Sequence, residues 1–243
     1  MQEQIFKLTL EMINDEIYFN HLVMNLPNHS YYWSDDWSEE FYISAAKRGF
    51  ISVSHLDGTS FLLLPELQFE YGILEFEKLH ISKKVKALIN KNRYSFCINT
   101  RFDEVLQNIS NHHKNSWLQD NYVTLLKNLD RNKTSRNDFI IYSVELVERS
   151  TQKLIAGEIG YVIGRTYTSL SGFSSREKQH NNTGTLQMVL LAKYLHEKGF
   201  SFWNMGHPNM EYKKKLGSAI YTREKFLAKW NSATKNKTIL LGT

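Results

Sequence analysis

The sequence predicts an α+β fold, and residues 154–218 carry that prediction. Leu154–Gly164 is an apolar run of strand length, and a second such run follows at 165–174. A polar loop then leads to a helical pattern over about 185–196 and to a further apolar run at 200–206. These periods and lengths indicate two strands, a helix and a third strand. With 243 residues, of which 42% are hydrophobic and 23% charged, the chain can bury a substantial core.

Residues 1–78 are expected to form a small N-terminal α+β domain, and residues 79–243 a second domain. Short apolar runs up to residue 30 predict a strand or a short helix with loops. A moderately apolar helical face follows, and glycine is the usual residue just past the end of a helix. The elements expected there are a helix over 38–48 that ends at Gly49, and strands over 61–65 and 71–76.

The second domain begins with a helix that Ser82 can cap, because Val85, Leu88 and Ile89 share one face of it. Further along, apolar periodicity predicts strands and helices, and one polar stretch without periodicity predicts a loop. The expected elements are a strand over 94–99, helices over 102–110 and 121–129, a loop over 129–138, a strand over 139–147 and a turn over 148–153.

Composition excludes several classes of site. Cys97 is the single cysteine, so an internal disulfide and a multi-cysteine zinc site are excluded, and its apolar neighbours favour a core thiol. Adjacent His112 and His113 would point apart on a helix and lack further ligands, so no metal or redox cofactor is expected. The absence of a secretory signal and of a membrane-spanning run predicts a cytoplasmic protein. A net charge of +5 favours a polyanionic partner, most plausibly nucleic acid, although general abundance of Lys and Asn is an alternative explanation.

Glu158 is the first candidate catalytic residue because it lies inside an apolar run, where an unpaired charge is costly to bury. Ala156, Gly157 and Gly160 flank it and allow another backbone or a ligand to come close. Partial burial would raise its pKa towards that of a useful proton acceptor. The alternative is a structural carboxylate that forms a salt bridge with Arg165 or a lysine.

Several short segments in register resemble the leucyl/phenylalanyl-tRNA–protein transferase family. They are Leu79-His80-Ile81-Ser82-Lys83, Asn115-Ser116-Trp117, Leu154–Gly164, Ser171–Ser174, and Leu216-Gly217-Ser218 followed by Arg223 and Phe226-Leu227. The resemblance covers roughly residues 31–228. The order of elements after residue 139 also resembles the GNAT-type acyltransferase fold, whose mixed central sheet is flanked by helices and whose splayed central strands form the acyl-donor cleft.

The resemblance implies an aminoacyltransferase that moves an apolar amino acid of the Leu, Phe or Met type from aminoacyl-tRNA. The acceptor would be the amino group of a protein N-terminus that begins with Arg or Lys, as for an N-degron, or another amine. The aminoacyl ester is already activated, so the reaction requires a proton acceptor and oxyanion donors but no covalent intermediate. We expect a monomer with no cofactor and no membrane partner.

The sequence departs from the family at positions to which the resemblance would assign catalysis. Leu170 replaces an acidic residue, and Asn204-Met205-Gly206 replaces Asp-x-Gln. Leu62–Leu64 stand where the family has a Trp-Trp pair that would stack on the terminal adenosine. We expect Glu158 to place a carboxylate in the same cavity and Asn204 to orient an amine or a carbonyl. Gln187 is a further candidate for a replacement polar group.

Further residues are candidates for binding the substrates. In the family, the tryptophan at the position of Trp117 is implied to contact the nucleotide end of the donor, and here the ring either stacks on a base or packs in the core. Lysines on one helix face would contact tRNA phosphates, although most such faces are merely solvated. The predicted amino acid pocket contains Ile159, Leu170, Phe173 and Met188, and the predicted tRNA contacts are Lys83, Lys84, Lys86, Lys91, Arg93, Lys213 and Lys214.

Two other functions stay open. An acyl-CoA-dependent N-acyltransferase would need a glycine-rich loop for the pyrophosphate, and the loop at 175–184 has one glycine. A catalytically inactive relative that binds tRNA or peptide is the second alternative, because Leu170, Asn204 and Gly206 replace the family's polar residues.

Overall fold

The computed structural model describes residues 5–26, 28–112 and 117–242, and these fall into two compact units. The first unit comprises the described residues up to 69 together with 117–132, and the second comprises 70–112 and 133–242. The predicted division into domains 1–78 and 79–243 stays a prediction. We describe each unit by itself.

The first unit combines helices with a β-hairpin around an aromatic core. Phe50 contacts the rings of Phe19 and Tyr32 edge to face, and Tyr42 contacts Tyr122 in the same way. The elements of this unit are β1 (Phe6–Lys7), α1 (Leu10–Asn14), α2 (Glu16–Asn25), β2 (Tyr32–Trp33), α3 (Glu39–Lys47), the antiparallel pair β3 (Ile51–Asp57) and β4 (Ser60–Glu66), and α6 (Asp120–Arg131).

The second unit is built on a mixed seven-stranded sheet with the strand order β11-β5-β10-β9-β8-β7-β6. The strands β6 to β9 are antiparallel neighbours, and β10 lies parallel to β9. The elements are β5 (Glu70–Leu74), α4 (Lys83–Lys91), β6 (Tyr94–Ile98), α5 (Phe102–His112), β7 (Ile140–Glu148), β8 (Leu154–Ile163), β9 (Thr166–Ser174), α7 (Thr183–Glu197), β10 (Phe202–Asn204), α8 (Glu211–Leu216), β11 (Ala219–Thr222) and α9 (Arg223–Thr234).

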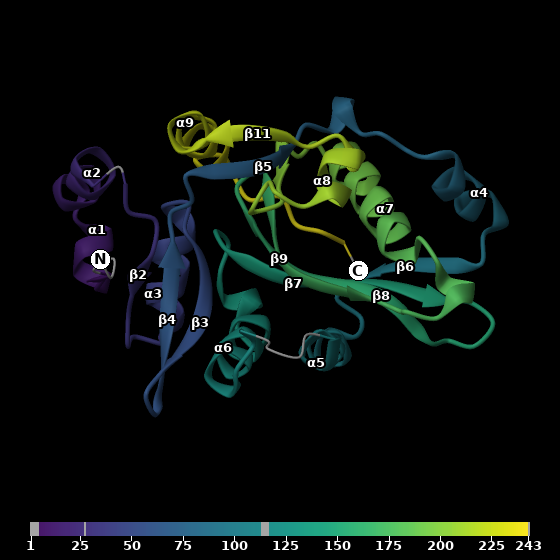
Figure 1. The fold of residues 1–243 in the computed structure, drawn as a ribbon, viewed down its shortest axis with the longest axis horizontal. Coiled ribbons are helices and arrows are strands. Elements are labelled where there is room, and N and C mark those ends of the chain that lie inside the picture. Colours follow the sequence, from purple (N-terminus) through teal and green to yellow (C-terminus); the bar gives the residue numbers. More distant parts are fainter. Residues whose placement is uncertain (1–4, 27, 113–116, 243) are drawn as a thin grey trace. The chain divides into compact units, whose positions relative to one another are not determined.

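The centre of this sheet is covered on both faces. Helix α7 lies over one face of β7 to β9, and α5 lies under the other (Figure 1). Every residue of β7 and β8 is consequently buried, and a strand covered on both faces takes a nearly continuous apolar sequence rather than an alternating one. A charged residue on β8 is therefore an exception that needs a structural partner.

The predicted α+β fold is confirmed. The expected helices and strands are present, with shifts of a few residues at their ends, because caps rather than periodicity set the boundaries. Two helices, α1 and α2, form in the first 30 residues, and α6 ends at Arg131, so the first three residues of the expected loop at 129–138 are helical. The basic segment after residue 206 resolves into α8, β11 and α9. None of the helices in the described part of the chain has both the length and the apolar character required to cross a membrane.

Candidate active site

Glu158 on β8 is buried and accepts three hydrogen bonds. Its Oε1 accepts one from Tyr167 Oη at 3.0 Å and one from Ser169 Oγ at 2.8 Å, and its Oε2 accepts one from Gln187 Nε2 at 3.3 Å. Only 5% of the residue is exposed. Neutral donors therefore satisfy the carboxylate where water cannot reach it. Arg165, the predicted alternative partner, donates instead to the backbone oxygen of Gly199, so its predicted salt bridge with Glu158 is wrong.

The β8–β9 hairpin brings these donors to Glu158. Tyr167 and Ser169 lie two positions apart on β9, so both side chains face α7. Gly160 leaves room for the phenol, because a Cβ at this position would lie 2.3 Å from Tyr167 Oη. The register shifts between Ile159 and Gly160, and this bulge offsets the following β9 residues by one position.

Burial raises the pKa of Glu158 above its ordinary value of 4.5. The hydrogen bonds from Ser169, Tyr167 and Gln187 act in the opposite direction, as does the charge of Lys213. A buried carboxylate with a raised pKa accepts a proton more readily than an exposed one. Tyr167 is itself buried, and burial together with the charge of Glu158 raises the pKa of its phenol well above 10.0, so it acts as a donor to the carboxylate.

A second layer of hydrogen bonds supports the first. Trp203 Nε1 donates to Ser169 Oγ at 2.8 Å, so the Ser169 hydroxyl is oriented with its proton towards Glu158. Trp203 is fully buried on β10, opposite Tyr167 in the parallel register. The candidate site therefore joins three neighbouring strands and α7, and its side chains have little freedom to reorient.

β9 and β10 part next to this cluster. Their pairing ends at Thr168 and Asn204, after which β9 stays paired with β8. The chain beyond β10 instead follows β5, through a hydrogen bond from Met205 N to Gly72 O at 2.8 Å. Thr168 Oγ1 and Asn204 Nδ2 are buried at this point and lack a hydrogen-bond partner among the described residues. Two unsatisfied polar atoms at the point where the strands separate are available to a bound polar group.

The predicted catalytic residues are only partly brought together. Gln187 contacts Glu158 directly, as its place near the start of α7 allows. Asn204 lies one position past Trp203 on β10, so its side chain faces the opposite side of the sheet from Glu158. Its Oδ1 accepts a hydrogen bond from Gly206 N at 3.0 Å, which orients the amide with Nδ2 free.

The predicted apolar pocket residues also lie on different faces of the sheet. Ile159 follows Glu158 on β8 and therefore points to the opposite face. Phe173 lies on the same side as Ile159, since its ring would be 3.2 Å from a Cβ at Gly157. Met188 belongs to α7 and packs against the core on the face of Glu158. The structure thus does not gather these side chains around the carboxylate.

Two further predicted binding residues have distinct surroundings. Leu170 is the extra residue of the β9 bulge, because Ser169 pairs with Gly160 and Ser171 with Ile159. Trp117 belongs to the first unit, where its ring centroid lies 4.7 Å from that of Tyr122. Its packing in that core favours the structural alternative, and nucleotide stacking stays a prediction. The Asn115-Ser116 context of Trp117 and the predicted surface residue His113 lie outside the described residues.

Most of the predicted tRNA-binding residues are exposed, but Lys213 is not. Lys83, Lys84, Lys86 and Lys91 on α4 and Lys214 on α8 are exposed, as phosphate contact requires. Helices α4, α7 and α8 lie on the same side of the sheet (Figure 1). Lys213 is 6% exposed, and its ammonium donates to backbone oxygens in the interior. Its predicted phosphate contact is therefore wrong.

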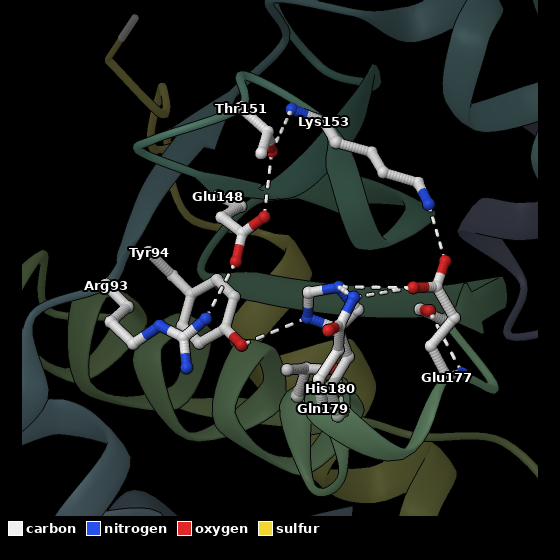
Figure 2. A network of polar contacts seen from close by, with 10 residues as sticks. Arg93, Tyr94, Glu148, Thr151, Lys153, Glu177, Gln179 and His180 are labelled. Atoms are coloured by element: carbon white, nitrogen blue, oxygen red, sulfur yellow. Dashed lines mark hydrogen bonds and ion pairs between the residues drawn. The ribbon is translucent and has the colours of Figure 1, made fainter.

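Arg93 is exposed but forms an ion pair with a carboxylate. Its Nη2 lies 3.0 Å from Glu148 Oε1 in a polar network that joins the start of β6 to the loop before α7. In this network Tyr94 Oη lies 3.2 Å from His180 Nδ1, and Lys153 is paired with Glu177 at 2.5 Å. Figure 2 shows the members Arg93, Tyr94, Glu148, Thr151, Lys153, Glu177, Gln179 and His180. The network fixes the 175–182 loop and leaves Arg93 less available to phosphates than the lysines of α4.

Sequence reasoning missed Tyr167, Ser169, Trp203 and the buried state of Lys213. Alternation on β9 indicates that Tyr167 and Ser169 share a face, and a tight turn at Gly164 pairs that strand with β8. The bulge at Leu170, which sets the pairing of the rest of β9 with β8, has no comparable signal in the sequence. Within the described ranges, no cluster of three or more His, Cys, Asp or Glu side chains is placed to hold a metal ion.

The model of the leucyl/phenylalanyl-tRNA protein transferase family matches residues 73–231. The chain belongs to this family. The matched segment contains Glu158, all three of its hydrogen-bond donors and Lys213. Membership in this transferase family supports aminoacyl-tRNA-dependent aminoacyl transfer as the general activity. A comparison with curated proteins gives no match.

Solved structures with a similar arrangement have low sequence identity. FemX is 12% identical with a TM-score of 0.48, covering 96% of this chain and 77% of FemX. L-PGS from Bacillus licheniformis is 12% identical with a TM-score of 0.42, covering 84% of this chain and 72% of that one. A tandem GNAT protein from the clavulanic acid biosynthesis pathway is 10% identical with a TM-score of 0.39, covering 85% and 68%.

Proposed function

We propose that the chain transfers an apolar aminoacyl group, of the leucine, phenylalanine or methionine type, from aminoacyl-tRNA to the amino group of a protein N-terminus or another amine. The family match supports the reaction class. The observation that carries the chemistry is Glu158, a buried carboxylate with a raised pKa that three neutral groups hold in place.

In this reaction the amine nitrogen attacks the carbonyl carbon of the ester between the amino acid and the tRNA ribose. A C–N bond forms, the ester C–O bond breaks, and the ribose oxygen leaves with a proton. The attacking nitrogen loses a proton, which Glu158 accepts and then gives to the leaving ribose oxygen. The unpartnered Asn204 Nδ2 and Thr168 hydroxyl lie on the opposite face of the sheet from Glu158, so they can donate to a polar group of a substrate bound where β9 and β10 part, but not directly beside the carboxylate.

The exposed lysines of α4, which are Lys83, Lys84, Lys86 and Lys91, support tRNA as the donor, and the exposed Lys214 belongs to α8, a helix on the same side of the sheet as α4 (Figure 1). Exposed lysines attract phosphates without reading bases, which suits a transferase that recognises the aminoacyl end. An apolar pocket would select the amino acid by burial, which contributes about 1.5–3 kcal/mol for an apolar side chain; of the predicted pocket residues, Met188 is the one on the Glu158 face of the sheet.

The test is transfer of a radiolabelled amino acid from charged bulk tRNA to a protein with an N-terminal Arg. Glu158→Gln keeps the shape of the side chain but removes its proton acceptor. The matched control is Glu145→Gln, because Glu145 is a fully buried carboxylate on the adjacent strand β7 whose hydrogen bonds come from Ser143, Thr100 and Arg101.

Transfer by the wild type and by Glu145→Gln, with loss in Glu158→Gln, is the expected result. Equal loss in both variants would assign the effect to buried charge in general and contradict the role of Glu158. Salt-sensitive binding of charged tRNA without transfer would keep the donor and overturn the N-terminal Arg acceptor. Neither transfer nor binding would overturn the proposal and make acyl-CoA the next donor to test.

A further inference from the structure

Lys213 is a buried lysine whose ammonium contacts backbone oxygens. Its Nζ donates to Met205 O at 2.5 Å and to His207 O at 2.8 Å. These two carbonyls flank Gly206, whose own N–H donates to Asn204 Oδ1 at 3.0 Å. Lys213 therefore holds the segment of chain that directly follows Asn204 on β10.

The other side of that segment is held by β5. Gly72 N donates to Gly206 O at 2.6 Å, and Met205 N donates to Gly72 O at 2.8 Å. Gly206 has a φ of 71°, a left-handed conformation that other residues rarely adopt. The segment is thus fixed between β5 and Lys213 in a conformation that it would not keep by itself. The position of the Asn204 amide depends on this arrangement.

The charge of Lys213 also acts on Glu158. Burial lowers the pKa of Lys213 to about 8, while the negative charge of Glu158 acts to raise it. Reciprocally, Lys213 is the cation whose charge lowers the pKa of Glu158. Among the described residues, the phenols of Tyr167 and Tyr212 also interact with Glu158, whose charge helps to raise their pKa values. Lys213 is therefore the positive counterpart of the candidate base.

We propose that Lys213 is a positioning residue of the candidate active site, which holds Met205–His207 beside Asn204 and whose positive charge acts on Glu158. This inference rests on the proposed function only in that it treats Glu158 as the proton acceptor. The neighbouring Lys214 is exposed and can contact phosphates, so adjacent lysines have separate tasks.

Lys213→Met and the matched control Lys214→Met separate the two tasks. NMR titration of 13C-labelled Glu side chains should show a higher pKa for Glu158 in Lys213→Met and no change in Lys214→Met. The salt dependence of binding to charged bulk tRNA should decrease by about one in log–log slope in Lys214→Met and stay unchanged in Lys213→Met. The reverse pattern, with a changed slope and an unchanged Glu158 titration in Lys213→Met, would overturn the proposal.

A second measurement leaves Lys213 in place, in case its replacement prevents folding. In Glu158→Gln the attraction of the carboxylate is gone, so the pKa of Lys213, followed by NMR of 15N-labelled lysine, should fall below its wild-type value. An unchanged lysine titration would overturn the proposal. Neither titration requires transfer activity. A failed transfer assay would therefore contradict the proposed function, whereas the role of Lys213 is tested by the two titrations.

Discussion

Replacing Tyr167 with Phe should raise the pKa of Glu158 by about one to two units. The phenol donates to Glu158 Oε1 at 3.0 Å, and both residues are buried. A hydrogen bond to a charged group contributes roughly 1.5–3 kcal/mol. About 1.4 kcal/mol corresponds to one pKa unit, so loss of this donor destabilises the ionised carboxylate enough to raise its pKa by about one to two units. Phe fills the same space apart from the hydroxyl, so packing changes little.

The assay is NMR titration of 13C-labelled Glu side chains, in which Glu158→Gln identifies the signal of Glu158. Tyr142→Phe is the matched control, because Tyr142 is buried in the same core but its hydroxyl accepts a hydrogen bond from Leu241 N and is not one of the donors to Glu158. An unchanged Glu158 titration in Tyr167→Phe, or an equal shift in Tyr142→Phe, would refute the reasoning. If the enzyme transfers aminoacyl groups, the acidic limb of its pH–rate profile should move upward with the titration.

Three further predictions concern stability and binding. Because burial raises the pKa of Glu158, the folded state binds the carboxyl proton more tightly than the unfolded state. This contribution to the free energy of unfolding is lost as the pH rises from 4.5 through the pKa of the folded state. Urea unfolding of Glu158→Gln at several pH values should lack this loss, and the same pH dependence as in the wild type would contradict the prediction. Gly160→Ala should lower the free energy of unfolding by about 1–3 kcal/mol, because its Cβ would lie 2.3 Å from Tyr167 Oη, and an unchanged urea midpoint would count against that contact. Lys84→Ala should reduce the log–log salt dependence of tRNA binding by about one without changing the Glu158 titration, and a constant slope would exclude α4 from the tRNA surface.

The sequence could predict most of the fold because the chain keeps strong local signals. The apolar run of β8, the cap at Ser82 and Gly49 past α3 each correspond to a feature of the structure. Glu158 stood out because a charge within a buried strand requires a reason. The helices of the first 30 residues were ambiguous because α2 has apolar residues on several sides and lacks a clear period.

The details of the site depend on features that local pattern does not encode. A one-residue bulge decides which residues of β9 reach Glu158, and nothing in the sequence marks its position. Burial of Lys213 and exposure of Lys214 follow from the docking of the short helix α8, whereas a run of three lysines suggests one shared role. The opposite orientations of Glu158 and Ile159, by contrast, follow from strand alternation alone.

The β8–β9 hairpin also affects how the site forms during folding. Two of the three groups that bond to Glu158 are only 9 and 11 residues away in the sequence, whereas Gln187 is 29 residues away. Closing a short segment of chain loses less entropy than closing a long one. The hydroxyls of Tyr167 and Ser169 therefore reach the carboxylate when the hairpin pairs. The amide of Gln187 and the ammonium of Lys213 take their places only after α7 and α8 have docked. Changes in the long connections would slow completion of the site more than they would disturb the hairpin.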